Sequence, residues 1–106
     1  MEHSVREEAD AVVAAFSGDV DLESSPRARE LLLGLVRGGR KVLVDLSAVD
    51  YIDSSGVASL IEAFQAARRG GTGFALVAPN PAALRVLQLA RLDRVFTIHA
   101  TLGDAL

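Results

Sequence analysis

The chain has 106 residues, of which half are hydrophobic and 24% are charged. This length supports one hydrophobic core but not two, and the composition is that of a folded chain. With 11 basic and 14 acidic side chains the formal net charge is −3, which excludes an electrostatic case for binding nucleic acid. We therefore expect a single domain over residues 1–106 with no nucleic-acid partner.

Residue types that build disulfides, metal sites and membrane spans are missing or too sparse. There is no cysteine, which excludes disulfides and thiolate chemistry. His3 and His99 lie far apart and have no metal-ligand spacing. No apolar run approaches the roughly 20 residues that span a bilayer. We expect no metal, no cofactor and no membrane insertion, and the cytoplasm is the default location.

The first third of the chain predicts a hairpin and a helix. Residues 5–8 and 11–17 are short extended stretches around Ala9-Asp10, and residues 18–21 (Gly-Asp-Val-Asp) punctuate the second stretch. Ser25 followed by Pro26 has the form of an N-cap with proline at the first helical position. The helix is expected to end at Gly38-Gly39. Its core stripe comprises Ala28, Leu31, Leu32 and Leu35.

The middle of the chain predicts a strand that leads into a second helix. Residues 41–45 are apolar on both faces, as in a sheet covered by helices. A helix follows Ser55 and ends near Gly70-Gly71, with Arg68 and Arg69 as cations suited to its C-terminus. One face of this helix carries apolar side chains at positions i, i+3, i+4 and i+7, namely Val57, Leu60, Ile61 and Phe64.

The last third of the chain repeats the pattern. Residues 73–77 predict a short strand, and Asn80-Pro81 opens a helix through Leu84, Leu87 and Ala90. Residues 95–98 fit a last strand and residues 101–106 a terminal helical turn. The alternation of helices and strands predicts an α/β fold with a mostly parallel sheet of about five strands and three to four helices.

The junction Asp53-Ser54-Ser55-Gly56 delivers two hydroxyls to the start of a helix, where free N–H groups favour negative charge. Asp53 or Ser54 is a natural N-cap, and this leaves the Ser55 hydroxyl in the first turn free to face solvent. A phosphorylated serine there would act as a switch. The alternative is that these residues only cap a core helix.

A serine hydrolase is a poor match to the same residues. A nucleophilic serine needs a base held by a third group, and esterases place it in Gly-x-Ser-x-Gly. Ser55 lacks that motif, and the candidate bases are only His3, near the N-terminus, and His99, just past a predicted strand. We therefore expect no enzymatic activity and assign no catalytic residues.

The chain resembles the STAS domain of the bacterial anti-sigma factor antagonist type, over roughly residues 4–105. Four segments carry the resemblance in the same order along the chain: residues 18–21 (Gly-Asp-Val-Asp), 42–47 (Val-Leu-Val-Asp-Leu-Ser), 51–56 (Tyr-Ile-Asp-Ser-Ser-Gly) and 92–96 (Leu-Asp-Arg-Val-Phe). The resemblance implies an open sheet with helices packed mainly on one face. It also implies a function in protein binding.

In members of this type the serine before the glycine is phosphorylated by a partner kinase that is itself an anti-sigma factor, and a phosphatase restores it. The resemblance gives this role to Ser55. By analogy, the partner-facing patch comprises Asp21, Asp53, Ser54, Ser55 and Gly56.

Two positions depart from the family pattern. Arg91 stands where the family often has glycine, and the residues after Gly56 lack the second glycine of sporulation-type antagonists. The sequence is therefore also compatible with a STAS subunit of a lipid-transporting ABC system. Such a subunit binds the ATPase subunit of the transporter without a phosphorylation cycle.

Overall fold

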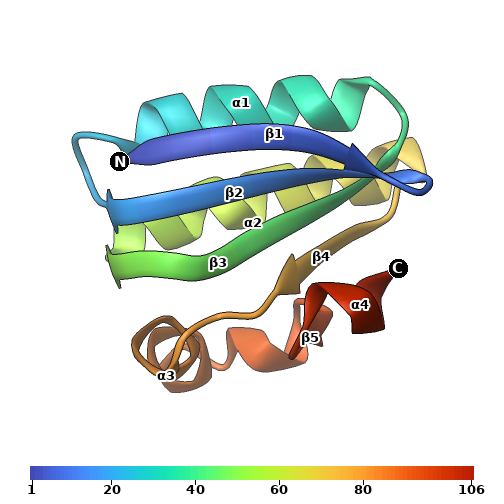
Figure 1. The fold of residues 1–106 in the computed structure, drawn as a ribbon. Coiled ribbons are helices and arrows are strands. Elements are labelled where there is room, and N and C mark those ends of the chain that lie inside the picture. The colour runs from blue at the N-terminus through green and yellow to red at the C-terminus, as the bar shows by residue number, and fades with distance from the viewer.

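The computed structural model describes residues 1–106 as one five-stranded sheet with helices on both faces (Figure 1). The strands stand in the order β1-β2-β3-β4-β5, with β1 antiparallel to β2 and every other pair parallel. The strands are β1 (Glu2–Glu8), β2 (Ala11–Val20), β3 (Lys41–Ile52), β4 (Phe74–Val77) and β5 (Ile98–His99). The helices are α1 (Ser25–Arg37), α2 (Ser54–Gly70), α3 (Pro81–Leu89), α4 (Leu102–Ala105) and the 3-10 turn η1 (Leu92–Arg94). The predicted α/β fold is confirmed.

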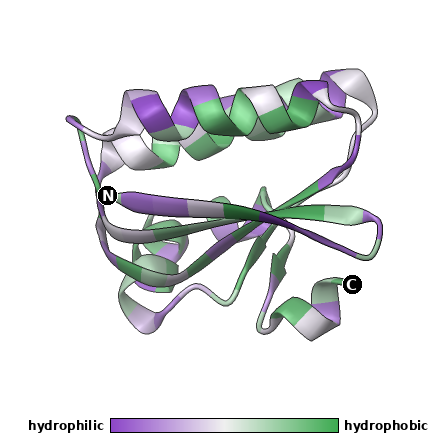
Figure 2. Cartoon of the chain, turned by 45° about the horizontal axis from the view of Figure 1, so that its top comes forward, coloured by the Kyte–Doolittle hydropathy of each residue, from purple (hydrophilic) through white to green (hydrophobic).

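Alternate side chains of the strands point to opposite faces of the sheet and pack into two hydrophobic cores of unequal size. Val42 and Val44 of β3 belong to a cluster of 20 buried residues, which includes side chains of α1, α2 and α3. Leu43, on the opposite face of β3, belongs to a cluster of six, closed by Ala105 of α4. Figure 2 shows α1 and α2 side by side on one side of the sheet. The helices therefore pack mainly on one face, as expected.

Strands β2 and β3 are longer than the sequence indicates. Residues 18–21 predict the end of the second strand, but β2 continues to Val20. Strand β3, predicted over residues 41–45, runs 12 residues to Ile52. Gly18 has a φ of +78°, and the register slips beside it, so that Gly18 pairs with Val49 while the next residue, Asp19, pairs with Tyr51. Strands β2 and β3 stabilise each other over this length by parallel pairing, which no local sequence pattern reveals.

The start of α1 differs by one residue from the prediction. Its N-cap is Ser24 and not Ser25, and Pro26 therefore occupies the second helical position. The Ser24 hydroxyl makes no capping bond to the helix, because it donates to the carbonyl oxygen of Asp19 at 2.9 Å and accepts from the N–H of Asp21 at 3.0 Å. Helix α2 begins at Ser54, ahead of the predicted start after Ser55. Helix α3 begins at Pro81 as predicted, and Asn80 caps it by accepting from the N–H of Ala83.

The C-terminal part contains a shorter last strand than residues 95–98 predict. Phe96 turns into the core instead and stacks edge-on against Phe64, with ring centroids 5.4 Å apart. Strand β5 then comprises only Ile98 and His99, after which Thr101 caps the expected terminal turn. None of the helices has the length and hydropathy needed to cross a lipid bilayer.

Candidate functional site

Two loops meet at the edge of the sheet where β2 and β3 end. The N–H of Asp53 donates to the carbonyl oxygen of Val20 at 3.3 Å, which joins the two strand ends. The N–H of Leu22, in the loop before α1, donates to Asp53 Oδ2 at 3.2 Å. The structure thus brings the segments of Asp21 and Asp53 together, as the predicted patch requires.

Asp53 also caps α2. Its Oδ1 accepts from the N–H groups of Ser55 at 2.9 Å and Gly56 at 3.0 Å, so both carboxylate oxygens are used, one for each loop. The sequence left Asp53 and Ser54 as alternative N-caps, and the structure assigns the role to Asp53. Ser54 is instead the exposed first residue of the helix.

Gly56 lies buried under this junction. A Cβ atom on Gly56 would collide with the carbonyl oxygen of Val20 and approach Cγ1 of Ile52 to 2.7 Å. Only glycine therefore lets the first turn of α2 sit this close to the end of β2. Gly56 positions the preceding serines, and its own surface is largely hidden.

Asp21 organises the loop before α1. Its Oδ1 accepts from the N–H groups of Glu23 and Ser24, both at 3.1 Å, and lies 3.1 Å from the Ser24 hydroxyl oxygen. The pKa of Asp21 is lowered, chiefly because the Ser24 N–H stabilises the ionised carboxylate. Asp21 is thus a turn-forming residue at the position where the patch was predicted.

Ser55 is half-buried at the rim of a cleft of about 410 Å³ between α1 and α2. Ser25, Pro26 and Arg29 of α1 and Ser55, Ala58, Ser59 and Glu62 of α2 line it. Ser59 is buried at its base, where its hydroxyl lies 3.1 Å from the carbonyl oxygens of both Ser25 and Ser55. Sequence reasoning missed Ser59, because this serine lies off the apolar stripe of Val57, Leu60, Ile61 and Phe64 and is buried only by the packing of α1 against α2.

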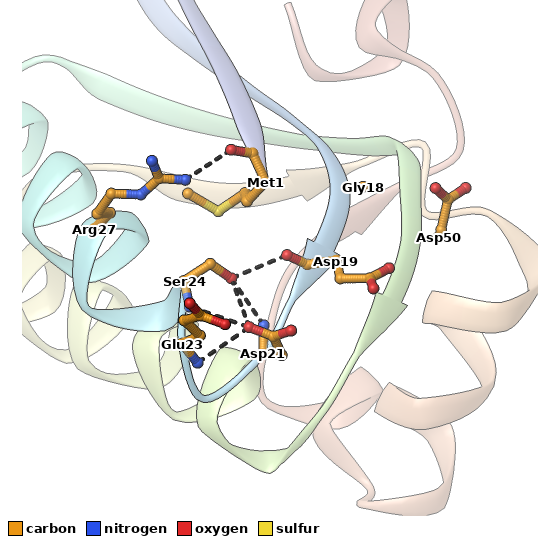
Figure 3. A pocket seen from close by; sticks show the side chains of 8 residues that line it. All are labelled: Met1, Gly18, Asp19, Asp21, Glu23, Ser24, Arg27 and Asp50. Atoms are coloured by element: carbon orange, nitrogen blue, oxygen red, sulfur yellow. Dashed lines mark hydrogen bonds between the residues drawn. The ribbon is translucent and has the colours of Figure 1, made fainter.

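A second, polar pocket is lined by residues at the end of β2, in the loop before α1 and at the start of α1, Asp21 among them (Figure 3). Asp19, Asp21, Glu23 and Asp50 contribute carboxylates to it, but no group of three such side chains could hold a metal ion. Arg27 also lines the pocket and donates to the carbonyl oxygen of Met1 at 2.7 Å. The edge of the sheet around Asp53 is therefore acidic.

Apolar side chains are exposed at the same edge. Leu22 is 75% exposed next to the Asp53 contact, and Tyr51 is 54% exposed near the end of β3. Because its side chain is exposed, Tyr51 is available for contact with a partner. Neither histidine lines the Ser55 cleft, since His3 and His99 lie on the two outer strands of the sheet.

Comparisons with known proteins agree with this architecture. The family model described as STAS domain matches residues 3–105. A Thermotoga neapolitana protein named as the homologue of an anti-sigma factor antagonist is 30% identical over 99 residues, covering 92% of this chain and 88% of the relative. The anti-sigma-B factor antagonist of Bacillus subtilis is 24% identical over 96 residues, covering 91% and 88% of the two chains.

Among solved structures, the crystal structure of an anti-sigma factor antagonist from Mycobacterium paratuberculosis is similar along nearly the whole chain. The TM-score is 0.90 at 30% sequence identity, with 98% of this chain and 89% of the other covered. The family match over residues 3–105 includes all five strands of the sheet and the four segments that carry the resemblance, apart from the first residue of β1. The chain therefore belongs to the STAS domain family.

Proposed function

We propose that this chain is an anti-sigma factor antagonist that binds a serine kinase acting as the anti-sigma factor, and that phosphorylation of Ser55 releases this partner. The observation that carries the proposal is the position of Ser55. It stands in the first turn of α2, half-buried, directly beside the carboxylate that joins the two loops. Relatives of similar length bear the antagonist name.

The proposed binding surface comprises Asp21, Asp53, Ser54 and Ser55, with Gly56 beneath them. Its acidic and apolar character fits a partner that offers basic side chains around an apolar contact. Asp21 and Asp53 hold the two loops in place through backbone N–H groups, which supports a binding surface formed before the partner arrives.

Phosphorylation would act on this surface by charge. A phosphate adds about −1.5 to −2 charge and three acceptor oxygens. The helix N-terminus favours it by only about 0.3–1 kcal/mol, whereas like charges brought together in an interface cost several kcal/mol. With Asp53 adjacent, repulsion dominates once a partner covers the site. The domain stays folded and loses its partner.

The choice of Ser55 over Ser54 does not rest on capping, because Asp53 and not Ser54 caps the helix. It rests on the family pattern, in which the serine directly before the glycine is modified. The test is incubation with the cognate kinase and ATP, followed by peptide mass spectrometry; the cognate phosphatase, added afterwards, should remove the modification. We expect phosphate on Ser55, none in Ser55→Ala and wild-type modification in Ser54→Ala. Phosphate mapped to Ser54 or Ser59 would refute the assignment to Ser55. Binding to an ABC ATPase subunit without any phosphorylation would refute the antagonist function and support a transporter function instead.

A further inference from the structure

The cleft beside Ser55 contains one basic side chain, Arg29 of α1. Its guanidinium forms an ion pair with the carboxylate of Glu62, across the groove between α1 and α2. The two side chains are 51% and 48% exposed. Because solvent screens their charges, the ion pair contributes little free energy. Arg29 is therefore available to a stronger anion in the same cleft.

Arg29 of α1 and Ser55 of α2 line the same cleft from two adjacent helices. Both helices begin at the same edge of the sheet. The Ser59 hydroxyl contacts the Ser25 carbonyl oxygen at 3.1 Å, so Ser25 of α1 lies level with Ser59 of α2 along the helix axes. Ser55 lies one turn, about 5.4 Å, before Ser59. Arg29 lies one turn after Ser25, and its guanidinium pairs with Glu62 in this structure. Because helical side chains lean toward the N-terminus and Arg29 and Ser55 line the same cleft, the long Arg29 side chain can reach along the groove toward a phosphate on the first turn of α2.

We propose that Arg29 is the internal counter-ion of phosphorylated Ser55: on modification its guanidinium leaves Glu62 and binds the phosphate. This inference rests on the proposed function, because it takes Ser55 as the modified residue. A phosphate carries more charge than the Glu62 carboxylate and offers oxygens that match the planar guanidinium at two points. The exchange therefore favours the phosphate.

The surrounding charges define what Arg29 must offset. The Asp53 carboxylate contacts the Ser55 N–H, and Glu62 lines the same cleft. Asp21 lies in the neighbouring loop. All three repel a phosphate, and Arg29 is the one cation of the cleft that attracts it. Arg29 thus lets α2 carry a phosphate at this position in the free, folded protein.

The test places phosphoserine at position 55 during translation, by suppression of an amber codon, so that no kinase is needed. The pKa of the phosphate is then measured by 31P NMR titration. We expect this pKa to rise by up to about one unit in Arg29→Gln relative to the wild type, because the stabilising cation is lost. Glu62→Gln should lower it, because a competing and repelling carboxylate is removed.

Two controls are matched to this experiment. Arg27→Gln removes a cation of the same helix that lines the other pocket, and it should leave the titration unchanged. Phosphoserine at position 54, which does not line the cleft, should titrate alike with and without Arg29. Circular dichroism of each variant checks folding, which the loss of a half-exposed ion pair should not disturb.

An unchanged pKa of phosphoserine 55 in folded Arg29→Gln would overturn the inference, as would an equal response to Arg27→Gln. That result would leave the proposed function standing, since the kinase plays no part in the measurement. Conversely, a kinase that ignores Ser55 would refute the proposed function and leave the measured contact intact.

Discussion

Helices α2 and α3 begin at the same edge of the sheet, each after a β-strand and each with a capping side chain that reaches a second segment. Asp53 caps α2 and holds the loop before α1 through the N–H of Leu22. Asn80 caps α3 and donates its amide to the carbonyl oxygen of Val49. The two junctions are thus built alike but differ in charge.

The residues after each cap set the two junctions apart. Proline and alanines follow Asn80, so the start of α3 offers no side-chain donor or acceptor. Two serines follow Asp53, over a buried glycine. A neutral cap with apolar successors serves structure alone, whereas a charged cap with free hydroxyls also offers a surface for recognition.

The largest effect should come from the shared core beneath both junctions. Leu60 of α2 and Leu87 of α3 are 3% and 0% exposed in the same cluster. Leu60→Ala and Leu87→Ala should each lower the free energy of unfolding by about 2–5 kcal/mol, because each leaves a cavity. Urea denaturation measures this loss. Partner binding by the folded fraction should stay normal in both variants, and a direct loss of affinity in Leu60→Ala would place the α2 core in the interface.

Truncation of the two caps should separate their roles. Asp53→Ala and Asn80→Ala should each cost about 1–2 kcal/mol of stability, since each leaves helix N–H groups without an acceptor. Only Asp53→Ala should also weaken binding of the kinase, measured by calorimetry. Asp53→Asn retains an acceptor oxygen and isolates the contribution of the charge. Equal loss of affinity on truncation of Asn80 would break the comparison.

A negative charge in the first turn of α2 should leave stability almost unchanged. Ser55→Asp should shift the free energy of unfolding by no more than about 1 kcal/mol, because the helix N-terminus favours a negative charge in its first turn. The same change should abolish or greatly weaken kinase binding. A thermal melt beside a calorimetric titration distinguishes the two effects. Unfolding of the mutant would mark Ser55 as a structural residue.

The smallest effect should come from the charge of Asp21. Its pKa lies below the ordinary value of 3.8 in the folded chain, chiefly because of the Ser24 N–H. A carboxylate with a depressed pKa stabilises the fold above the unfolded pKa, and this contribution is lost as pH falls through the folded pKa. The stability difference between wild type and Asp21→Asn should therefore be present at neutral pH and vanish in acid.

Binding assays on Asp21 variants address the patch separately. Asp21→Ala removes the acceptor for two loop N–H groups as well as the charge, whereas Asp21→Asn keeps an acceptor. If both lower affinity, the charge contacts the partner. If only Asp21→Ala does, Asp21 acts by shaping the turn, and the patch reduces to residues 53–56.

Local patterns predicted the helices well and the strands less well. The periodicity of Val57, Leu60 and Phe64 and the Asn80-Pro81 pair depend on neighbours within one helix, and both helices were found where expected. The full length of β3 depends on pairing with β2, which lies some 30 residues earlier and is invisible to a local pattern. The last strand shrank because burial of Phe96 outweighed its strand propensity.

The same distinction applies to the site. Asp53, Ser54 and Ser55 were found as a cluster because they are adjacent in sequence, but both Asp53 and Ser54 are good caps, and only the fold chose between them. The contacts of Ser59 with Ser25 and of Arg29 with Glu62 join residues more than 30 positions apart. Such contacts need the packing of α1 against α2 and could not be read from spacing.

The hydrogen bonds of Asp53 with Val20 and Leu22, and of Ser59 with Ser25, have a consequence for the rate of recognition. A surface whose loops are already cross-linked has little conformational entropy left to lose when a partner docks. Association is then limited by diffusion and orientation, and the acidic edge should steer a basic partner toward it. The association rate constant should consequently fall steeply as salt is added, while the dissociation rate constant changes little.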